Sequence, residues 1–247
     1  MCFEYHIKWR LYGLVRQFIS DVGIRREKIA MRVNNLSKIR LQDCAMLIID
    51  MQNDFIADDA PIRCPGGGDI IPNIREIKHW AHTHNIPVFY TKEEHRWQKT
   101  DFGMETQREE PEHCLEGTLG VEIVSGLEPG QDDYIIIKRR YSGFYLSDLD
   151  VLLSGLGKNV LLVAGVATNV CVYATVLDAH QRDMRSVVLR DCVAGTSLEL
   201  HEAFLKNIEY VLGDVITSNE LMRHFDDGGI TICKSTGREE GTYCRCV

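Results

Sequence analysis

The stretch VLLVAGVATNVCVYATVLDAHQRD, residues 160–183, decides the fold of this chain. It begins as a run of apolar strand-forming residues, breaks at Gly165, and continues with the pattern of a helix that carries Cys171 in its first turn. A buried strand that leads directly into a helix is the repeating unit of a parallel α/β sheet. Packing alone does not require a thiol there, so the stretch also raises the question whether Cys171 is a core residue or a reactive group.

Units of the same kind recur along the chain. Near-continuous apolar runs separated by helical patterns predict a three-layer α/β/α fold of Rossmann-like type, with a six-stranded, mostly parallel sheet. A long polar segment, residues 92–120, interrupts the alternation, and loops of that length are usually functional or disordered. The expected strands are 45–50, 86–91, 134–140, 159–165, 185–192 and 214–218. The expected helices are 69–85 (with Pro72 in its first turn), 148–157, 168–183 and 197–213.

We expect one main domain, residues 41–225, with an extension at each side. Apolar residues at helical spacing over 3–22 predict an amphipathic helix in an N-terminal extension, residues 1–40. Its apolar face would pack either against another subunit or against its own domain. The C-terminal residues 226–247 are Gly-rich and polar, which predicts a flexible tail. A metal knuckle there is disfavoured, because the tail cysteines lack a second close pair: Cys233, Cys244 and Cys246.

Composition narrows the classes of function. The 247 residues carry a formal net charge of -8, with a sequence pI of about 5.6, which argues against binding to nucleic acid or to an anionic membrane surface. No apolar run approaches the roughly 20 residues that span a bilayer. The N-terminal segment scatters charges through its apolar part and so does not resemble a signal peptide. The nine cysteines are odd in number and unevenly spaced, which favours free thiols and a cytoplasmic location.

Three residues whose side chains can take part in a reaction follow three different expected strands. Asp50 ends the first, Lys138 lies at the end of the third, and Cys171 follows the fourth. In a parallel sheet all three point toward the same edge. Singly, Asp50 could cap a turn, Lys138 could be a solvated charge and Cys171 a small buried residue. An acid, an amine and a thiol at one edge together favour chemistry.

The order and wording of these segments resemble the isochorismatase-like cysteine hydrolases, which include nicotinamidases, N-carbamoylsarcosine amidases, ureidoacrylate amidohydrolases and biuret hydrolases. The resemblance covers roughly residues 43–222 and implies that the main domain has the isochorismatase-like hydrolase fold. It implies a catalytic triad of Asp50, Lys138 and Cys171, a cis peptide between Val166 and Ala167, and an oxyanion hole built from the backbone N–H groups of Ala167 and Cys171. Four motifs carry it: IIDMQNDF, HCLEGTLG, KRRYSGF with SDLDVLL, and VAGVATNVCVYATVLDA.

Elementary chemistry is consistent with a reactive Cys171. Gly165 permits a tight turn off the strand, and Thr168 is a candidate N-cap. Cys171 would then lie about three residues into the helix, where the positive end of the helix favours the thiolate.

The resemblance, together with Asp50, Lys138 and Cys171, predicts an amidohydrolase. Asp50 would take the thiol proton, and Cys171 would attack the carbonyl of a small amide, ureido or carbamoyl compound. Ammonia or an amine would leave, and water would release the acid from a thioester. Lys138 would stabilise negative charge and orient the pair. The partner is thus a small molecule, and the resemblance also implies a homo-oligomer.

A metal or other cofactor is not expected. Nicotinamidases of this family bind a metal through an Asp-x-His-x-x-x-His run. Here the matching stretch is EEHRWQK, in which Glu93 and His95 could replace the first two ligands but Lys99 replaces the last. This weakens a metal-assisted nicotinamidase, which stays an alternative because HCLEGTLG is shared with that group; Cys114 within that motif is interpreted as structural.

Substrate contacts are predicted from residue type near the sheet edge. Thr196 stands where N-carbamoylsarcosine amidases carry a carboxylate-binding arginine, so either the substrate differs or another group, such as Arg108, binds a carboxylate. Residues 100–113 are expected to cover the site, with a solvated acidic run of Glu109, Glu110 and Glu112. Core packing or a subunit contact is the alternative for each aromatic candidate. The candidates are Asn53, Phe55, Trp97, Tyr141, Phe144, Thr168 and Tyr173.

Two further classes of protein compete with a hydrolase. A thiol redox or sensor protein could use Cys171, but such proteins often carry a C-x-x-C pair, which Cys171 lacks. A non-catalytic oligomeric relative would not require an acid, an amine and a thiol at one edge.

Overall fold

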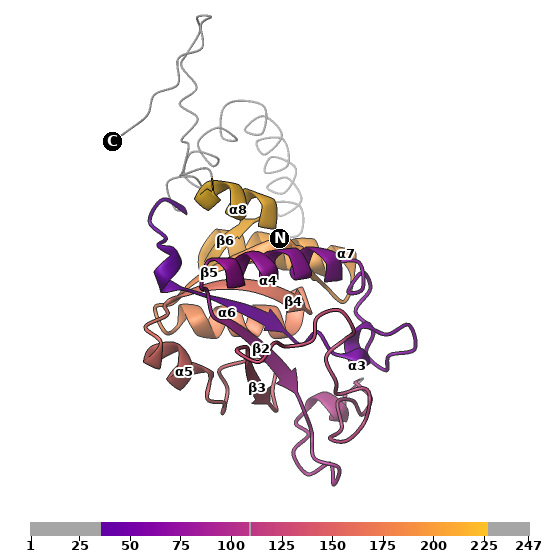
Figure 1. Cartoon of the computed structure of the whole chain (residues 1–247). Coiled ribbons are helices and arrows are strands. Elements are labelled where there is room, and N and C mark those ends of the chain that lie inside the picture. The colour runs from indigo at the N-terminus through magenta and orange to yellow at the C-terminus, as the bar shows by residue number, and fades with distance from the viewer. Residues whose placement is uncertain (1–35, 109, 227–247) are drawn as a thin grey trace, which may run out of the picture.

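The computed structural model of the chain describes residues 36–108 and 110–226 (Figure 1). The helix expected over residues 3–22 and the tail with its three cysteines lie outside the described residues. The limits of the predicted domain, 41–225, therefore stay a prediction. Among the described helices, none has the length and apolar character needed to cross a bilayer.

The centre of the molecule is a six-stranded sheet in which every pairing is parallel, in the order β3-β2-β1-β4-β5-β6. The predicted α/β/α fold with six strands is confirmed, and the sheet is wholly rather than mostly parallel. The strands are β1 (Cys44–Ile49), β2 (Val88–Glu93), β3 (Tyr134–Lys138), β4 (Val160–Val166), β5 (Arg185–Ala194) and β6 (Gly213–Ile216).

Helices cover both faces of this sheet, as Figure 1 shows. Alternate residues of β1 face opposite ways: Met46 packs in one apolar cluster and Leu47 in the other. The first cluster lies under α4 (Ile71–Thr83) and α8 (Ser218–Asp226). The second lies under α5 (Leu149–Gly155), α6 (Tyr173–His180) and α7 (Leu198–Asn207). The shorter helical segments are Leu41–Asp43, α3 (Asn53–Ile56), Glu105–Gln107, Thr168–Val172 and Ile208–Leu212.

The helix after β4 begins differently from the prediction. A π-helical turn, Thr168–Val172, precedes α6, and the capping position is Ala167 without a side-chain cap. Thr168 was wrongly predicted as the N-cap, because its hydroxyl lies 2.9 Å from the ring Nδ1 of His201 instead. Cys171 therefore lies in a π turn, a feature that occurs often at functional sites.

Gly165 is required by the close approach of β4 to β1. Its φ is +110°, and a Cβ atom there would lie 2.0 Å from the carbonyl oxygen of Ile49. No side chain fits at that distance, so the turn off β4 depends on glycine.

The strand order places a ligand site between β1 and β4. The chain runs outward from β1 through β2 to β3, and from β4 through β5 to β6 in the other direction. At such a reversal the loops diverge and leave a crevice beyond the carboxyl ends of the strands. Asp50 and Ala167, which follow β1 and β4, lie at this crevice.

Candidate active site

Asp50 follows β1 in a backbone conformation that is uncommon for a residue other than glycine. Its φ is +48°, and such conformations cluster at functional sites. The neighbouring strand β2 holds it: the backbone N–H of Asp50 donates to the carbonyl oxygen of Thr91 at 3.2 Å, and the Thr91 hydroxyl donates to Asp50 Oδ1 at 2.7 Å. The second carboxylate oxygen, Oδ2, faces the end of β3.

Lys138 ends β3 with its ammonium between two carboxylates. Its Nζ lies 2.8 Å from Asp50 Oδ2 and 2.5 Å from Glu93 Oε2, and it donates to the carbonyl oxygen of Arg140 at 3.0 Å. Glu93 ends β2 and is paired directly with Lys138 in the sheet register. The Lys138 side chain is fully buried, so this ion pair is shielded from water and salt.

Cys171 completes the group from the turn after β4. Its sulfur lies 3.7 Å from Lys138 Nζ and 4.0 Å from Glu93 Oε2, and within 4.8 Å of an Asp50 carboxylate oxygen. The predicted convergence of Asp50, Lys138 and Cys171 at one sheet edge is therefore confirmed. Cys171 keeps 6% of its surface exposed and lines a cavity, so a small molecule can reach it.

The surroundings hold Cys171 in its neutral thiol form. Burial raises its pKa well above the usual value; the charge of Lys138 opposes this, and the charges of Asp50 and Glu93 add to it. The prediction that the helix end favours a thiolate is thus wrong, because desolvation and two carboxylates outweigh it. A neutral thiol needs a base to take its proton.

The two carboxylates beside Lys138 differ in basicity. Burial raises the pKa of Asp50, and the charge of Glu93 adds to this. Burial also acts on Glu93, but Lys138, His113 and His95 outweigh it and hold the pKa of Glu93 well below its usual range. Glu93 thus carries the charge that balances Lys138, whose own pKa is raised well above normal by its anionic neighbours despite burial. Asp50 is the more basic partner of the thiol.

The peptide bond between Val166 and Ala167 is cis, as the resemblance implies. Both residues line the cavity next to Cys171. This cavity has a volume of about 50 Å³ on a measure by which one water needs about 10–15 Å³. The space admits a compound of a few heavy atoms.

Two of the seven predicted substrate contacts, Phe55 and Tyr141, line this cavity. The other five do not. Trp97 is 61% exposed, and Phe144 is buried in the core under Arg182. Both were predicted from residue type alone, which does not reveal the direction of a side chain.

The polar candidates among those five are occupied elsewhere. Asn53 donates through its side chain to the carbonyl oxygen of Leu119 at 2.8 Å. The Tyr173 hydroxyl accepts a hydrogen bond from Asn207 at 3.1 Å. Thr168 is fully buried beside His201. These three side chains therefore do not line the cavity.

Several lining residues were not predicted as contacts. Glu110 was interpreted as a solvated surface residue, but it is half-buried and lines the cavity. Glu112, from the same run, is exposed and pairs with Lys99 at 2.6 Å, whereas Glu109 lies outside the described residues. The further lining residues are Ile62, Cys64, Glu93, His113, Val170 and Thr196.

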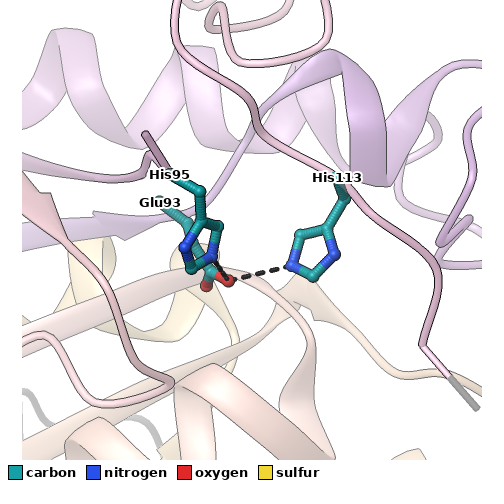
Figure 2. Close-up of side chains that lie close together, drawn as sticks. All are labelled: Glu93, His95 and His113. Carbon is teal, nitrogen blue, oxygen red and sulfur yellow. Dashed lines mark hydrogen bonds and ion pairs between the residues drawn. The ribbon is translucent and has the colours of Figure 1, made fainter. Parts of the chain in front are cut away.

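Glu93, His95 and His113 form a second cluster against the first. Figure 2 shows the two imidazole rings approaching one carboxylate oxygen. His95 Nε2 lies 3.3 Å and His113 Nε2 3.0 Å from Glu93 Oε1. The expectation of no metal rested on Lys99, but Lys99 is exposed, and the structure brings His113 to this position from the HCLEGTLG motif.

The charges of this cluster fit a bound cation. His113 Nδ1 donates to the carbonyl oxygen of Pro111 at 2.8 Å, so a neutral ring turns a lone pair toward Glu93. The lone pairs of His113 Nε2 and Glu93 Oε1, 3.0 Å apart, would repel each other. The contact therefore requires either a second proton on the ring or a cation between the two atoms. Burial alone would lower the pKa of His113, but the hydrogen bond to Glu93, the charges of Glu93 and Glu110 and the contact with Pro111 together raise it.

Distances and an orphan nitrogen also fit a metal ion. Zn–N and Zn–O bonds of about 2.0–2.1 Å place the ligand atoms of a tetrahedral site about 3.3 Å apart. Within the described part of the chain, His95 Nδ1 is buried without a hydrogen-bond partner, and it lies 3.7 Å from an Asp101 carboxylate oxygen. With a metal on Nε2, Nδ1 would carry the proton and face this carboxylate.

Comparisons with known proteins agree with the fold. The family model of the isochorismatase domain matches residues 44–220. A protein of Arabidopsis thaliana named a probable inactive nicotinamidase is 34% identical over 178 residues, 70% of this chain and 91% of its own. The ureidoacrylate amidohydrolase RutB of Acinetobacter baylyi is 29% identical over 208 residues, 74% and 84% of the two chains. The crystal structure of an isochorismatase-like hydrolase from Alkaliphilus metalliredigens superposes with a TM-score of 0.69 at 35% identity, covering 74% of this chain and 99% of that one.

Proposed function

Because the chain belongs to the isochorismatase family of hydrolases, we propose that it is a cysteine-dependent amidohydrolase that cleaves a C–N bond of a small amide, ureido or carbamoyl compound. The observation that carries this proposal is the meeting of a protonated thiol, a basic carboxylate and a buried ammonium at the wall of a small cavity. A purely structural role requires none of the three.

The reaction begins with Cys171. Asp50 takes the proton from the thiol as the sulfur attacks the substrate carbonyl carbon. Asp50 then gives this proton to the leaving nitrogen, so ammonia or an amine departs and a thioester remains. In the second half, Asp50 accepts a proton from water, which attacks the thioester. The acid is released, and Cys171 recovers its proton.

Lys138 and the turn after β4 stabilise the charge that develops. The Lys138 ammonium lies beside both the sulfur and the base, and Glu93 fixes its position. The backbone N–H groups of Ala167 and Cys171 are the proposed donors to the oxyanion, a contribution commonly worth about 3–4 kcal/mol per donor.

A metal-assisted nicotinamidase is the second candidate, favoured by the Glu93, His95 and His113 cluster. These residues would hold a divalent ion such as zinc. Such an ion, when bound, polarises a carbonyl or a water molecule. The name of the Arabidopsis relative points to the same substrate class but also to a protein without that activity.

A redox role for Cys171 is less well supported. Cys64 lines the same cavity, which supplies a second thiol. However, the Cys64 thiol donates to the carbonyl oxygen of Gly195 at 3.1 Å, and burial raises its pKa to about 12. A resolving cysteine requires thiolate character, which this environment suppresses.

The experiment is ammonia release from nicotinamide, an N-carbamoyl amino acid, ureidoacrylate and biuret. We expect turnover of at least one compound, inhibition by iodoacetamide and retention of activity after chelation. Hydrolysis of nicotinamide that chelator abolishes and zinc restores would support the second candidate instead. Turnover that depends on a reductant, with no amide cleaved, would contradict both.

Self-association and a cytoplasmic location, expected from the sequence, remain predictions. Exposed apolar side chains of Leu198 and Tyr210, 78% and 83% exposed, are compatible with a subunit contact. Light scattering of the full chain measures the oligomeric state directly.

A further inference from the structure

Glu110 stands where two cavities meet. The inner one holds Cys171, and a larger one of about 620 Å³ lies outside it. Glu110 and Tyr141 are the residues that line both. A substrate with its carbonyl at the sulfur and more atoms than the inner cavity holds would therefore extend past these two side chains.

The Glu110 carboxylate has capacity for a ligand. Its Oε1 accepts a hydrogen bond from the Tyr141 hydroxyl at 3.2 Å. Among the described residues no other hydrogen-bond partner of this carboxylate is found, so its remaining lone pairs face the cavity or solvent. Burial raises the pKa of Glu110, as expected for a carboxylate partly withdrawn from water.

The inner cavity offers little positive charge to offset its acids, because the ring of His113, which lines it, is already paired with Glu93 at 3.0 Å. Its lining includes the three acids Asp50, Glu93 and Glu110, but no Lys or Arg among the described residues. Lys138 lies behind the first two and is held between them. Thr196, on the wall, is neutral and accepts a hydrogen bond from Asn169 at 2.8 Å. A carboxylate placed in this space would face like charge without a partner, which is costly.

Arg108 is a cationic residue that lines the outer cavity. It is exposed, and it does not line the inner cavity. Only a long substrate would bring an anionic group to it. The anionic group of a short substrate would remain in the inner cavity, whose lining includes Asp50, Glu93 and Glu110.

We propose that Glu110 and Tyr141 form a recognition subsite for the nitrogen-bearing end of a small neutral or cationic amide, and that this subsite excludes compounds with a carboxylate close to the scissile bond. The inference rests on the proposed function, because it assigns the substrate class of the same cavity. Glu110 accepts hydrogen bonds from an amino, ammonium or ureido N–H group, while Tyr141 positions the carboxylate.

Charge selection is measured by alkylating Cys171 with reagents of similar size: iodoacetamide (neutral), iodoacetate (anionic) and 2-bromoethylamine (cationic). Each rate is followed by peptide mass spectrometry and divided by the rate of the same reagent with free glutathione. We expect the normalised rate of iodoacetate to be at least tenfold below that of iodoacetamide. Glu110→Gln should reduce this ratio of rates, the charge gap, at least threefold. Chelated and zinc-loaded protein are both tested, so that a cation on Glu93 does not account for the pattern.

The matched control is Glu112→Gln, which removes the same charge from an exposed position of the same segment and should leave the gap unchanged. Equal normalised rates in the wild type, failure to label Cys171 with any reagent, or no effect of Glu110→Gln would overturn the subsite. Circular dichroism checks that each variant is folded. Faster normalised labelling by iodoacetate than by iodoacetamide would also overturn the subsite if Arg108→Gln abolished that preference. The charge selection would then belong to Arg108.

A second assay separates this inference from the hydrolase proposal. Ammonia release is compared for propionamide, β-alaninamide and succinamate, which share the scissile amide but differ in charge. We expect succinamate to be the poorest substrate by at least tenfold. If Cys171 labelling shows the charge pattern but no amide is hydrolysed here or in the panel above, the hydrolase proposal fails and the subsite stands. If amides are hydrolysed and succinamate is preferred, the subsite fails and the hydrolase stands.

Discussion

At the ends of β1, β2 and β3 the charged groups are buried and lie against opposite charges. In the covering segment, residues 96–117, several charged side chains stay in partial contact with water, among them Lys99, Glu110 and Glu112. Lys138 shares its ammonium between Asp50 and Glu93 in the first region. In the covering segment, Glu110 is half-buried and accepts a hydrogen bond from the Tyr141 hydroxyl. Buried charges are strongly coupled, and removing one leaves another unpaired. We therefore expect substitutions at the strand ends to lower stability and activity, and substitutions in the covering segment to change substrate selectivity at little cost to the fold.

A pair of glycines gives the largest expected difference between the regions. Gly165→Ala in β4 places a Cβ atom 2.0 Å from a backbone oxygen, whereas Gly117→Ala in the covering segment meets no atom of the described residues within 4 Å, and both glycines have positive φ. We expect Gly165→Ala to lower the melting temperature by more than about 10 °C or to prevent folding. Gly117→Ala should cost about 1–2 kcal/mol, a shift of a few degrees. Equal shifts in thermal unfolding would contradict the rigid β1–β4 contact.

Two lysines give the next difference. Lys138→Met leaves two buried carboxylates without their cation, and we expect a loss of about 3–5 kcal/mol in the free energy of unfolding. Activity should fall about 1,000-fold or more, because the sulfur and its base lose their positioning charge. Lys99→Met, at an exposed ion pair with Glu112, should cost less than about 1 kcal/mol. Urea unfolding of both variants measures this, and similar losses would show that Lys138 is not held as the distances indicate.

Two aromatic residues give the smallest difference. Phe55 lines the inner cavity, so we expect Phe55→Ala to raise KM about tenfold. Trp97 is 61% exposed, so Trp97→Ala should change KM less than about twofold and stability by less than about 0.5 kcal/mol. Steady-state kinetics on any amide that is hydrolysed measure the KM of each variant relative to the wild type. A larger increase in KM for Trp97→Ala than for Phe55→Ala would show that Trp97 contacts the substrate.

The same division explains what could be predicted from the sequence. Asp50, Lys138 and Cys171 were predictable because each adjoins an apolar run, and parallel strands bring their carboxyl ends to one edge. The fold followed from the same runs. Local sequence could not tell that Phe144 faces the core or that Thr168 meets His201, 33 residues away. Residue type does not specify the direction of a side chain.

The Glu93, His95 and His113 cluster was missed for a related reason. Spacing within EEHRWQK pointed to Lys99 as the third position, whereas the actual partner of Glu93 lies 20 residues later, beyond an aperiodic segment. The HCLEGTLG motif contains that histidine, so the signal was present. The missing information was the path of the chain between the two motifs, which no periodicity specifies.

The central claim is that the Cys171 sulfur is the nucleophile, and Cys171→Ala tests it most directly. The control is Cys44→Ala, which removes a buried thiol at the opposite end of β1. On any amide that the wild type hydrolyses, we expect Cys171→Ala to lower kcat/KM at least about 1,000-fold with its fold intact, and Cys44→Ala to retain kcat/KM within about threefold. Wild-type kcat/KM in folded Cys171→Ala would contradict the account.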